Sequence, residues 1–318
     1  MKKELISILL TGTLAAGLLS GCGSAIAAEN SGAAEVSEAA EVSEAAEDST
    51  TPAAEPSAEA EASEDKKIVV GANPVPHADI LDNIVKEVLA EDGWELETVV
   101  FSDYVLPNTS LEQGELDANY FQTLGYMNQQ NQDAGLHLTA VAGIHIEPMG
   151  IYSQKYKALS ELPDGASIGI PNDPDNGARG LDLLVQKGLL VSKGDFGTDP
   201  SYTEDTLTKD KDANPHGYVI TPLEAANLPL SLPDLDAATI NGNYALEAGL
   251  PAEYPALDIE TFDDETTVKR TNFLVVKEGN ESSEKTQALI KALQSDKVQK
   301  YIDDTYKGAV ITSFIDAQ

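Results

Sequence analysis

Apolar residues along the chain fall into short continuous runs that alternate with stretches of helical spacing. The run Lys67–Ala72 predicts a short buried strand. Prolines in residues 73–76 predict a loop after it, because proline removes a backbone donor and restricts the residue before it. Residues 77–91 then predict an amphipathic helix, with Ile80, Leu81, Ile84, Val85, Val88 and Leu89 at helical spacing. Gly93 ends this helix, and alternation over residues 94–101 predicts a second strand.

The same order continues toward the C-terminus. We expect further strands over residues 118–122, 136–144, 168–170, 235–240 and 271–276, and further helices over residues 108–115, 123–134, 179–187 and 284–306. Alternating strands and helices predict an α/β architecture with mainly parallel sheets. Ligands of such sheets bind beyond the carboxyl ends of the strands. The loops of interest are therefore residues 73–77, 101–107, 118–123, 145–150, 172–179 and 241–244.

The N-terminus has the pattern of an export signal. A basic start, Met1-Lys2-Lys3, precedes an apolar stretch over residues 5–19 that is short for a membrane span with these flanks. The run Leu19-Ser20-Gly21-Cys22 follows, and it resembles the lipobox of bacterial lipoproteins, in which Cys22 carries lipid and becomes the first mature residue. The alternative is that Cys22 is an ordinary small residue near a cleavage point. Residues 1–21 are thus the expected signal peptide.

Composition separates a linker from the folded part. Residues 23–65 hold twelve acidic and no basic residues and almost no large apolar side chains, so residues 22–65 are expected to form a disordered acidic spacer. The whole chain of 318 residues has a formal charge of −34. This charge argues against a nucleic-acid partner, which needs clustered Lys and Arg. Residues 66–318 are long enough for one large domain or two small lobes.

The segment 172–179 lies between a predicted strand and a predicted helix. A helix start offers free N–H groups, and the fork of Arg179 suits a carboxylate. The segment therefore has the chemistry of a site for an anionic group. The alternative is a capped helix in which Arg179 pairs with Asp173 or Asp175.

Aromatic and amide residues follow three other strands. Phe101, Tyr104 and Tyr120 are candidates for the wall of a small-molecule pocket, and core packing is the alternative for each of them. Asn241 and Asn243 flank a glycine, which predicts a turn; as a site, their amide oxygens would accept from an ammonium group.

No catalytic or metal motif stands out. His145 and Glu147 lie two residues apart, but His77, His137 and His216 add no metal-ligand spacing, so we expect no metal. Nucleophile elbows and phosphate loops are missing from the sequence, and Cys22 is assigned to lipid. We therefore expect neither an enzyme nor a cofactor.

Six blocks in order resemble the NlpA/MetQ lipoproteins, the binding proteins of methionine-uptake ABC transporters. The blocks are residues 74–81, 101–108, 116–122, 145–153, 171–179 and 241–245, and the ending 306–310 fits as well. The resemblance extends over essentially all of residues 66–310, with family-like spacing between the blocks. The resemblance implies a two-lobed fold like that of type II periplasmic binding proteins, with two crossovers. The first lobe would be residues 66–147 and 242–318, and the second lobe residues 148–241.

The resemblance also implies roles for the candidate residues. Arg179 would hold an amino-acid carboxylate, and Asn176 with Asn241 or Asn243 would hold polar ends of the ligand. The aromatic residues Phe101, Tyr104 and Tyr120 would line the side-chain pocket, and His145 is counted among the ligand-binding residues. The protein would be a monomer, anchored through Cys22 on the extracytoplasmic face of a membrane, with an ABC permease and its ATPase as partners. On this basis Arg179→Ala is expected to abolish binding and leave the fold intact.

Two positions depart from the family pattern. Thr123 stands where the family usually has His, and Leu230 where it often has Arg. Both changes affect the choice of ligand, so L-methionine, D-methionine and a methionine-containing dipeptide stay open. A tethered surface protein with an adhesion or signalling role is the alternative function, and an exported enzyme is the third.

Overall fold

The structure is a computed structural model that describes residues 66–191 and 209–316. The chain divides into two units, Met1–Glu61 and Ala62–Gln318, and the described residues belong to the second. The predicted signal peptide, Cys22 and the acidic spacer up to residue 65 lie outside the described residues. None of the described helices is long and apolar enough to cross a bilayer.

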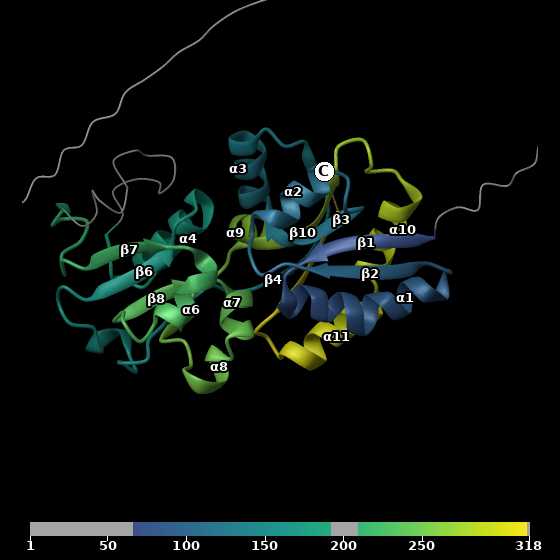
Figure 1. The fold of residues 1–318 in the computed structure, drawn as a ribbon. Helices are drawn as coiled ribbons and strands as arrows, with labels where there is room; N and C mark the ends of the chain where they lie inside the picture. Colours follow the sequence, from purple (N-terminus) through teal and green to yellow (C-terminus); the bar gives the residue numbers. More distant parts are fainter. Residues whose placement is uncertain (1–65, 192–208, 317–318) are drawn as a thin grey trace, which may run out of the picture. The chain divides into compact units, whose positions relative to one another are not determined.

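The described residues form two sheets with helices around them (Figure 1). The first sheet has the order β11-β4-β10-β3-β1-β2. Its strands are β1 (Lys67–Ala72), β2 (Glu95–Val100), β3 (Ala118–Thr123), β4 (Leu138–Ile146), β10 (Thr271–Lys277) and β11 (Ile311–Asp316). The helices that follow these strands are η1 (Pro74–Ala78), η2 (Leu81–Val85), α1 (Lys86–Glu91), α2 (Leu106–Glu112), α3 (Leu124–Ala134), α10 (Glu284–Leu293) and α11 (Asp296–Tyr306).

Side-chain alternation in the strands gives the first sheet an apolar layer on each face. In β10, Leu274 and Val276 join the cluster formed with the helices α1, α10 and α11. Phe273 and Val275 face the opposite way, into the cluster that contains Leu111 of α2. A strand buried on both faces reads as a continuous apolar run, which is why the sequence pattern located it.

The second sheet has the order β7-β6-β8-β5-β9. Its strands are β5 (Gly150–Tyr152), β6 (Ser167–Pro171), β7 (Val219–Leu223), β8 (Ala237–Ile240) and β9 (Asp258–Ile259). The helical segments after β5 are η3 (Leu159–Glu161), α4 (Pro174–Gln186), η4 (Ala225–Asn227), α6 (Leu228–Ser231), α7 (Gly242–Glu247), α8 (Leu250–Glu253) and α9 (Asp264–Arg270). Apolar clusters cover both faces of this sheet as well, one including α4 and the other α6 and α7.

The predicted α/β fold with two sheets is confirmed, but the sheets are mixed and not mainly parallel. β1 pairs in parallel with β2 and β3, and β6 with β7 and β8. The pairs β10–β3, β10–β4, β11–β4, β5–β8 and β5–β9 are antiparallel. The path of the chain accounts for one of these pairs: β4 leads out of the first sheet toward the second and β10 leads back beside it, so the two run in opposite directions.

The return of the chain to the first sheet also differs from the prediction. We expected it near Asn241–Ala245, with residues 242–318 in the first lobe. Strand β9 pairs with β5 of the second sheet, so the chain returns only between Ile259 and Thr271. Helix α7 follows Asn241, and its Tyr244 and Ala245 pack in an apolar cluster of the second sheet.

The predicted helix over residues 284–306 is two helices. The side chain of Ser295 accepts a hydrogen bond from the backbone N–H of Val298, and so caps the start of α11. Apolar spacing continues across the break, because Leu293 and Val298 pack into the same cluster. The hydrophobic pattern alone therefore did not reveal the break between the two helices.

Candidate functional site

One pocket gathers polar side chains from the ends of strands in both sheets. The space between its walls, open solvent included, is about 350 Å³. The pocket is lined by Tyr104, Phe121, Gln122, Thr123, Tyr126, Glu147, Asn176, Arg179, Asn241, Gly242, Asn243 and Asn272. Five of the predicted ligand residues are among them: Tyr104, Asn176, Arg179, Asn241 and Asn243. Their ligand roles stay predictions, but the fold brings them together.

The start of α4 shapes one side of the pocket. Helix α4 begins at Pro174, five residues before the predicted start, because the Asp173 carboxylate accepts from the backbone N–H of Asn176 at 2.9 Å and caps it. The side chain of Asn176 also donates to Asp173, at 3.0 Å. The free helix start that we predicted for an anion is therefore occupied by Asp173. Arg179 lies in the second turn of the helix.

Arg179 forms a buried ion pair, and its partner is Glu260 and not Asp173 or Asp175. Nε of Arg179 lies 3.1 Å from each carboxylate oxygen of Glu260, and Nη2 also contacts Glu260. Nη2 donates to the backbone oxygen of Glu147 at 2.8 Å. Burial works against the charge of Arg179, but the Glu260 carboxylate outweighs it and raises the pKa of Arg179. Among the backbone and side chains that the structure describes, no acceptor is bonded to Nη1.

Two asparagines present unused polar atoms to the pocket. Asn241 donates to Oδ1 of Asn176 at 2.7 Å, and the hydroxyl of Tyr104 donates to Oδ1 of Asn243 at 2.6 Å. The remaining atoms, Oδ1 of Asn241 and Nδ2 of Asn243, are buried and have no hydrogen-bond partner. A buried polar atom without a partner is costly. One free acceptor and one free donor in a pocket wall therefore indicate a polar ligand.

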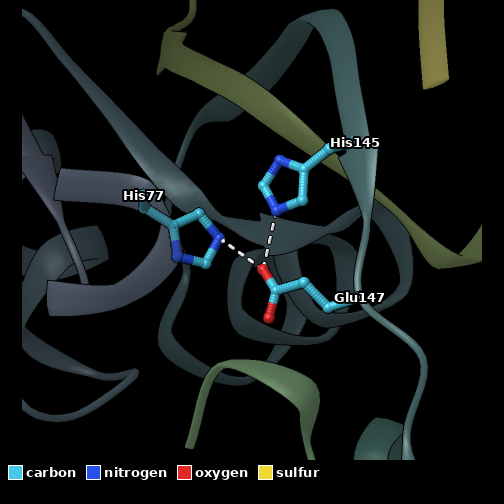
Figure 2. Close-up of side chains that lie close together, drawn as sticks. All are labelled: His77, His145 and Glu147. Atoms are coloured by element: carbon cyan, nitrogen blue, oxygen red, sulfur yellow. Dashed lines mark hydrogen bonds and ion pairs between the residues drawn. The ribbon is translucent and has the colours of Figure 1, made fainter. Parts of the chain in front are cut away.

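Glu147 lies where the chain leaves the first sheet, and two histidines hold it (Figure 2). Its Oε1 is 2.7 Å from Nε2 of His145 and 3.1 Å from Nε2 of His77. Burial alone would raise the pKa of Glu147, but His77 and His145 lower it to about 2, so the carboxylate is ionised at neutral pH. Burial lowers the pKa of His145, against the opposing effect of Glu147.

These three residues also have the ligand types of a metal site. Their ligand atoms lie within 4.8 Å of one another, and all three side chains are buried. Sequence spacing did not suggest such a set, because His77 lies far from His145 in the chain. In the described geometry the trio is joined by hydrogen bonds, and the hydroxyl of Tyr120 contacts Nδ1 of His145.

Three predicted ligand residues do not line the pocket. Phe101 packs near Gly71 in the apolar cluster of α2. Tyr120 is fully buried in the core of the first sheet, and His145 lies inside β4 and not in a loop. Phe101 and Tyr120 therefore lie in the apolar core, which was the alternative to a place in the pocket wall.

Several residues of the pocket wall were not among the predicted ligand residues. Glu147 was noted only as a neighbour of His145. Phe121 and Gln122 are the neighbours of Tyr120 in β3, and alternation along the strand could have placed Phe121 and Tyr120 on opposite faces. Tyr126 and Asn272 gave no signal, since they lie in a helix and in a strand distant along the chain.

The two departures from the family pattern lie in different surroundings. Thr123 lines the pocket, and its hydroxyl donates to Asp175 at 3.3 Å. Leu230 is 79 % exposed and lines a separate groove with Asp103, Glu224 and Glu247. Thr123 is therefore the departure that can change contacts to a ligand in the pocket.

Known proteins are similar to this chain over nearly all of the described residues. The model of the family described as NlpA lipoprotein matches residues 68–314. The chain is 36 % identical over 246 residues to the D-methionine-binding lipoprotein MetQ of Escherichia coli K12, covering 77 % of this chain and 86 % of that protein.

Two solved structures are similar over the same part of the chain. A nutrient binding protein from Burkholderia cenocepacia bound to methionine is 35 % identical with a TM-score of 0.71, covering 78 % of this chain and 100 % of that one. An ABC transporter periplasmic substrate-binding protein from Coxiella burnetii is 33 % identical with a TM-score of 0.69, covering 77 % and 100 %.

Proposed function

Because the chain belongs to the NlpA lipoprotein family, we propose that it is the substrate-binding lipoprotein of an ABC importer and captures methionine or a close derivative. Relatives named for methionine binding and for ABC transport support this proposal. The two sheets with their helices would act as lobes that close on the ligand and then dock on a membrane permease.

The observation that carries the proposal is the pairing of opposite charges in one pocket. Arg179 offers its Nη1 to a carboxylate, while the ionised Glu147 offers a carboxylate to an ammonium group. Glu260 is shared by Arg179 and Arg270, whose Nε lies 3.9 Å away. Arg270 also lies 3.7 Å from Asp182. A guanidinium and a separate carboxylate in one pocket suit the two charged ends of an α-amino acid zwitterion.

Aromatic rings favour a thioether side chain in the same pocket. The ring centroids of Tyr104, Phe121 and Tyr126 lie 5.6 to 6.1 Å apart, and all three residues line the pocket. A sulfur atom against an aromatic edge gains about 0.3–1.5 kcal/mol. The gain is modest, so close relatives of methionine are plausible ligands on this wall.

The membrane attachment is part of the proposal. Acyl chains on Cys22 would anchor the protein on the extracytoplasmic face, and the acidic segment after Cys22 would give the binding unit reach. The anchored binding protein would have a raised effective concentration near its permease.

Calorimetry on residues 62–318 tests the proposal. The fragment should be unfolded and refolded first to remove ligand that has co-purified, and then titrated with L-methionine, D-methionine and methionine dipeptides. We expect saturable binding of at least one of them with one site per chain. A refolded protein that binds none of these compounds would refute the methionine assignment and favour a tethered surface protein.

A further inference from the structure

Glu147 is held by two imidazoles that come from different parts of the first sheet. Resting on the proposed function, we propose that His77 and His145 are positioning residues: they hold the Glu147 carboxylate in place as the receptor for the ligand's ammonium group. His77 comes from η1 and His145 from the end of β4, so two separate elements fix one carboxylate. Neither histidine lines the pocket, whereas Glu147 does.

The contacts divide the carboxylate into a held oxygen and a free one. Both Nε2 atoms lie on Oε1, at 2.7 Å for His145 and 3.1 Å for His77. The dashed lines of Figure 2 end on this oxygen, and Oε2 points away from both rings. In the described part of the chain no hydrogen bond reaches Oε2. The free oxygen is therefore the one available to a ligand.

The hydrogen-bond pattern assigns the protons. An ionised carboxylate only accepts, so Nε2 of each imidazole must carry a proton and donate it. For His145, this leaves Nδ1 as the acceptor for the Tyr120 hydroxyl, whose pKa burial raises well above its usual value. For His77, Nε2 also lies 3.2 Å from Oδ1 of Asn272, a second acceptor. Tyr120 thus selects the tautomer of His145 that can support Glu147.

The support matters because the carboxylate is buried. Without donors, a buried carboxyl group takes up a proton and loses the charge that attracts an ammonium group. Glu147 is 4 % exposed, yet its two imidazole donors keep it ionised. Its backbone oxygen also accepts from Arg179. The same residue therefore sets the spacing between the ammonium and carboxylate ends of the ligand.

The test compares two probes that differ only in the amine. L-methionine and 4-(methylsulfanyl)butanoate, which lacks the amino group, are titrated into the wild type and into His145→Phe, His77→Phe and Glu147→Gln. We define amine selectivity as the Kd of the butanoate divided by the Kd of L-methionine. Removing a hydrogen bond to a charged group should reduce this selectivity about tenfold or more in each variant.

Matched variants separate positioning from loss of structure. His145→Gln keeps a side-chain N–H donor and should recover part of the amine selectivity. His137→Phe changes an exposed histidine outside the pocket and should leave the selectivity unchanged. A general loss of structure would weaken both probes equally and would leave their ratio as in the wild type, so an unchanged ratio in His145→Phe and His77→Phe overturns the proposal.

Two further results test the proposed function and the alternative of a metal site. If the wild type binds neither probe, the proposed function fails; if it binds both probes equally, the function stands and the ammonium receptor is refuted. Zinc is tested by dialysis followed by metal analysis of the refolded protein. We expect no stoichiometric zinc. One zinc ion per chain that is lost in His77→Phe would overturn the hydrogen-bonded role and identify a metal site instead.

Discussion

At the scale of single residues, Arg179 shows how a buried partner changes the effect of a substitution. Its guanidinium is buried against Glu260, and only part of its fork is left for a ligand. Removing one member of a buried ion pair leaves an unpaired charge, which costs more than the pair itself contributes. The sequence-based expectation that Arg179→Ala leaves the fold intact therefore needs revision.

We predict that Arg179→Ala lowers the free energy of unfolding by about 3–5 kcal/mol, because Glu260 is left without its main partner. The double variant Arg179→Met with Glu260→Gln should regain most of this stability, yet still fail to bind L-methionine. Urea denaturation measures the first effect and calorimetry the second. Equal stability of Arg179→Ala and the wild type would contradict the role of the pair.

The trio of His77, His145 and Glu147 predicts a pH dependence of stability. Burial lowers the pKa of His145 from 6.5, and the imidazoles lower that of Glu147 from 4.5 to about 2. In both cases the unfolded chain binds the proton at higher pH than the folded protein. Stability therefore falls as the pH falls.

We expect the free energy of unfolding to decrease as the pH drops below 6.5, through His145, and again between 4.5 and about 2, through Glu147. His145→Phe should flatten the curve between about pH 7 and about pH 5, where only a histidine titrates at its usual pKa. Urea titrations at a series of pH values check this. Parallel curves for variant and wild type in that range would argue against a buried neutral His145.

At the scale of secondary-structure elements, the start of α4 connects helix capping to the pocket. Asp173 accepts from the backbone and the side chain of Asn176, and Oδ1 of Asn176 in turn accepts from Asn241. A cap residue thus orients two residues of the pocket wall. Capping and ligand binding should therefore respond together when Asp173 is changed.

We predict that Asp173→Ala lowers the free energy of unfolding by about 0.5–2 kcal/mol and also weakens L-methionine binding. Asp173→Asn should keep most of the stability, since asparagine is a good cap. Ser295→Ala removes the equivalent cap of α11, far from the pocket lining, and serves as the control. It should lose a similar stability and keep its affinity; a matching loss of affinity there would show that the effect is not local.

The starts of α3 and α4 contact each other beside the pocket. Thr123 donates to Asp175, and a Cβ added at Gly125 would collide with the carboxylate of Asp175. We predict that Gly125→Ala weakens ligand affinity several-fold by pushing these two helix starts apart. Because the obstacle is the end of one side chain, Asp175→Ala in the same protein should restore part of the affinity. Calorimetry of both variants checks this, and a double variant no better than Gly125→Ala would contradict the steric reason.

At the scale of the whole molecule, residues 62–318 form a compact unit of their own. Apolar clusters cover both faces of both sheets, so the cores are complete within this unit. We predict that a fragment of residues 62–318 has the same thermal midpoint and the same affinity for L-methionine as the full chain. Calorimetric scans and titrations of both proteins measure this. A lower midpoint for the fragment would show that residues before 62 contribute to folding.

Much of the fold could be predicted because it depends on local apolar patterns. Strands such as β1 and β10 are buried on both faces and form short continuous apolar runs, which the sequence shows directly. Helix boundaries were harder to predict where a capping residue sets them, as Asp173 does for α4 and Ser295 for α11. Periodicity continues through such points, whereas the hydrogen bond of the cap depends on side-chain geometry.

The sequence by itself determined the α/β class, the resemblance to a lipoprotein family and five pocket residues, because strand ends and motif order are local properties of the chain. Only the tertiary structure decided that Arg179 pairs with Glu260, that Phe101 and Tyr120 lie in the core, and that His77 meets His145 on Glu147. The physical reason is distance along the chain. Charge pairing and burial are set by neighbours in space, and those neighbours come from strands and helices that the sequence does not place side by side.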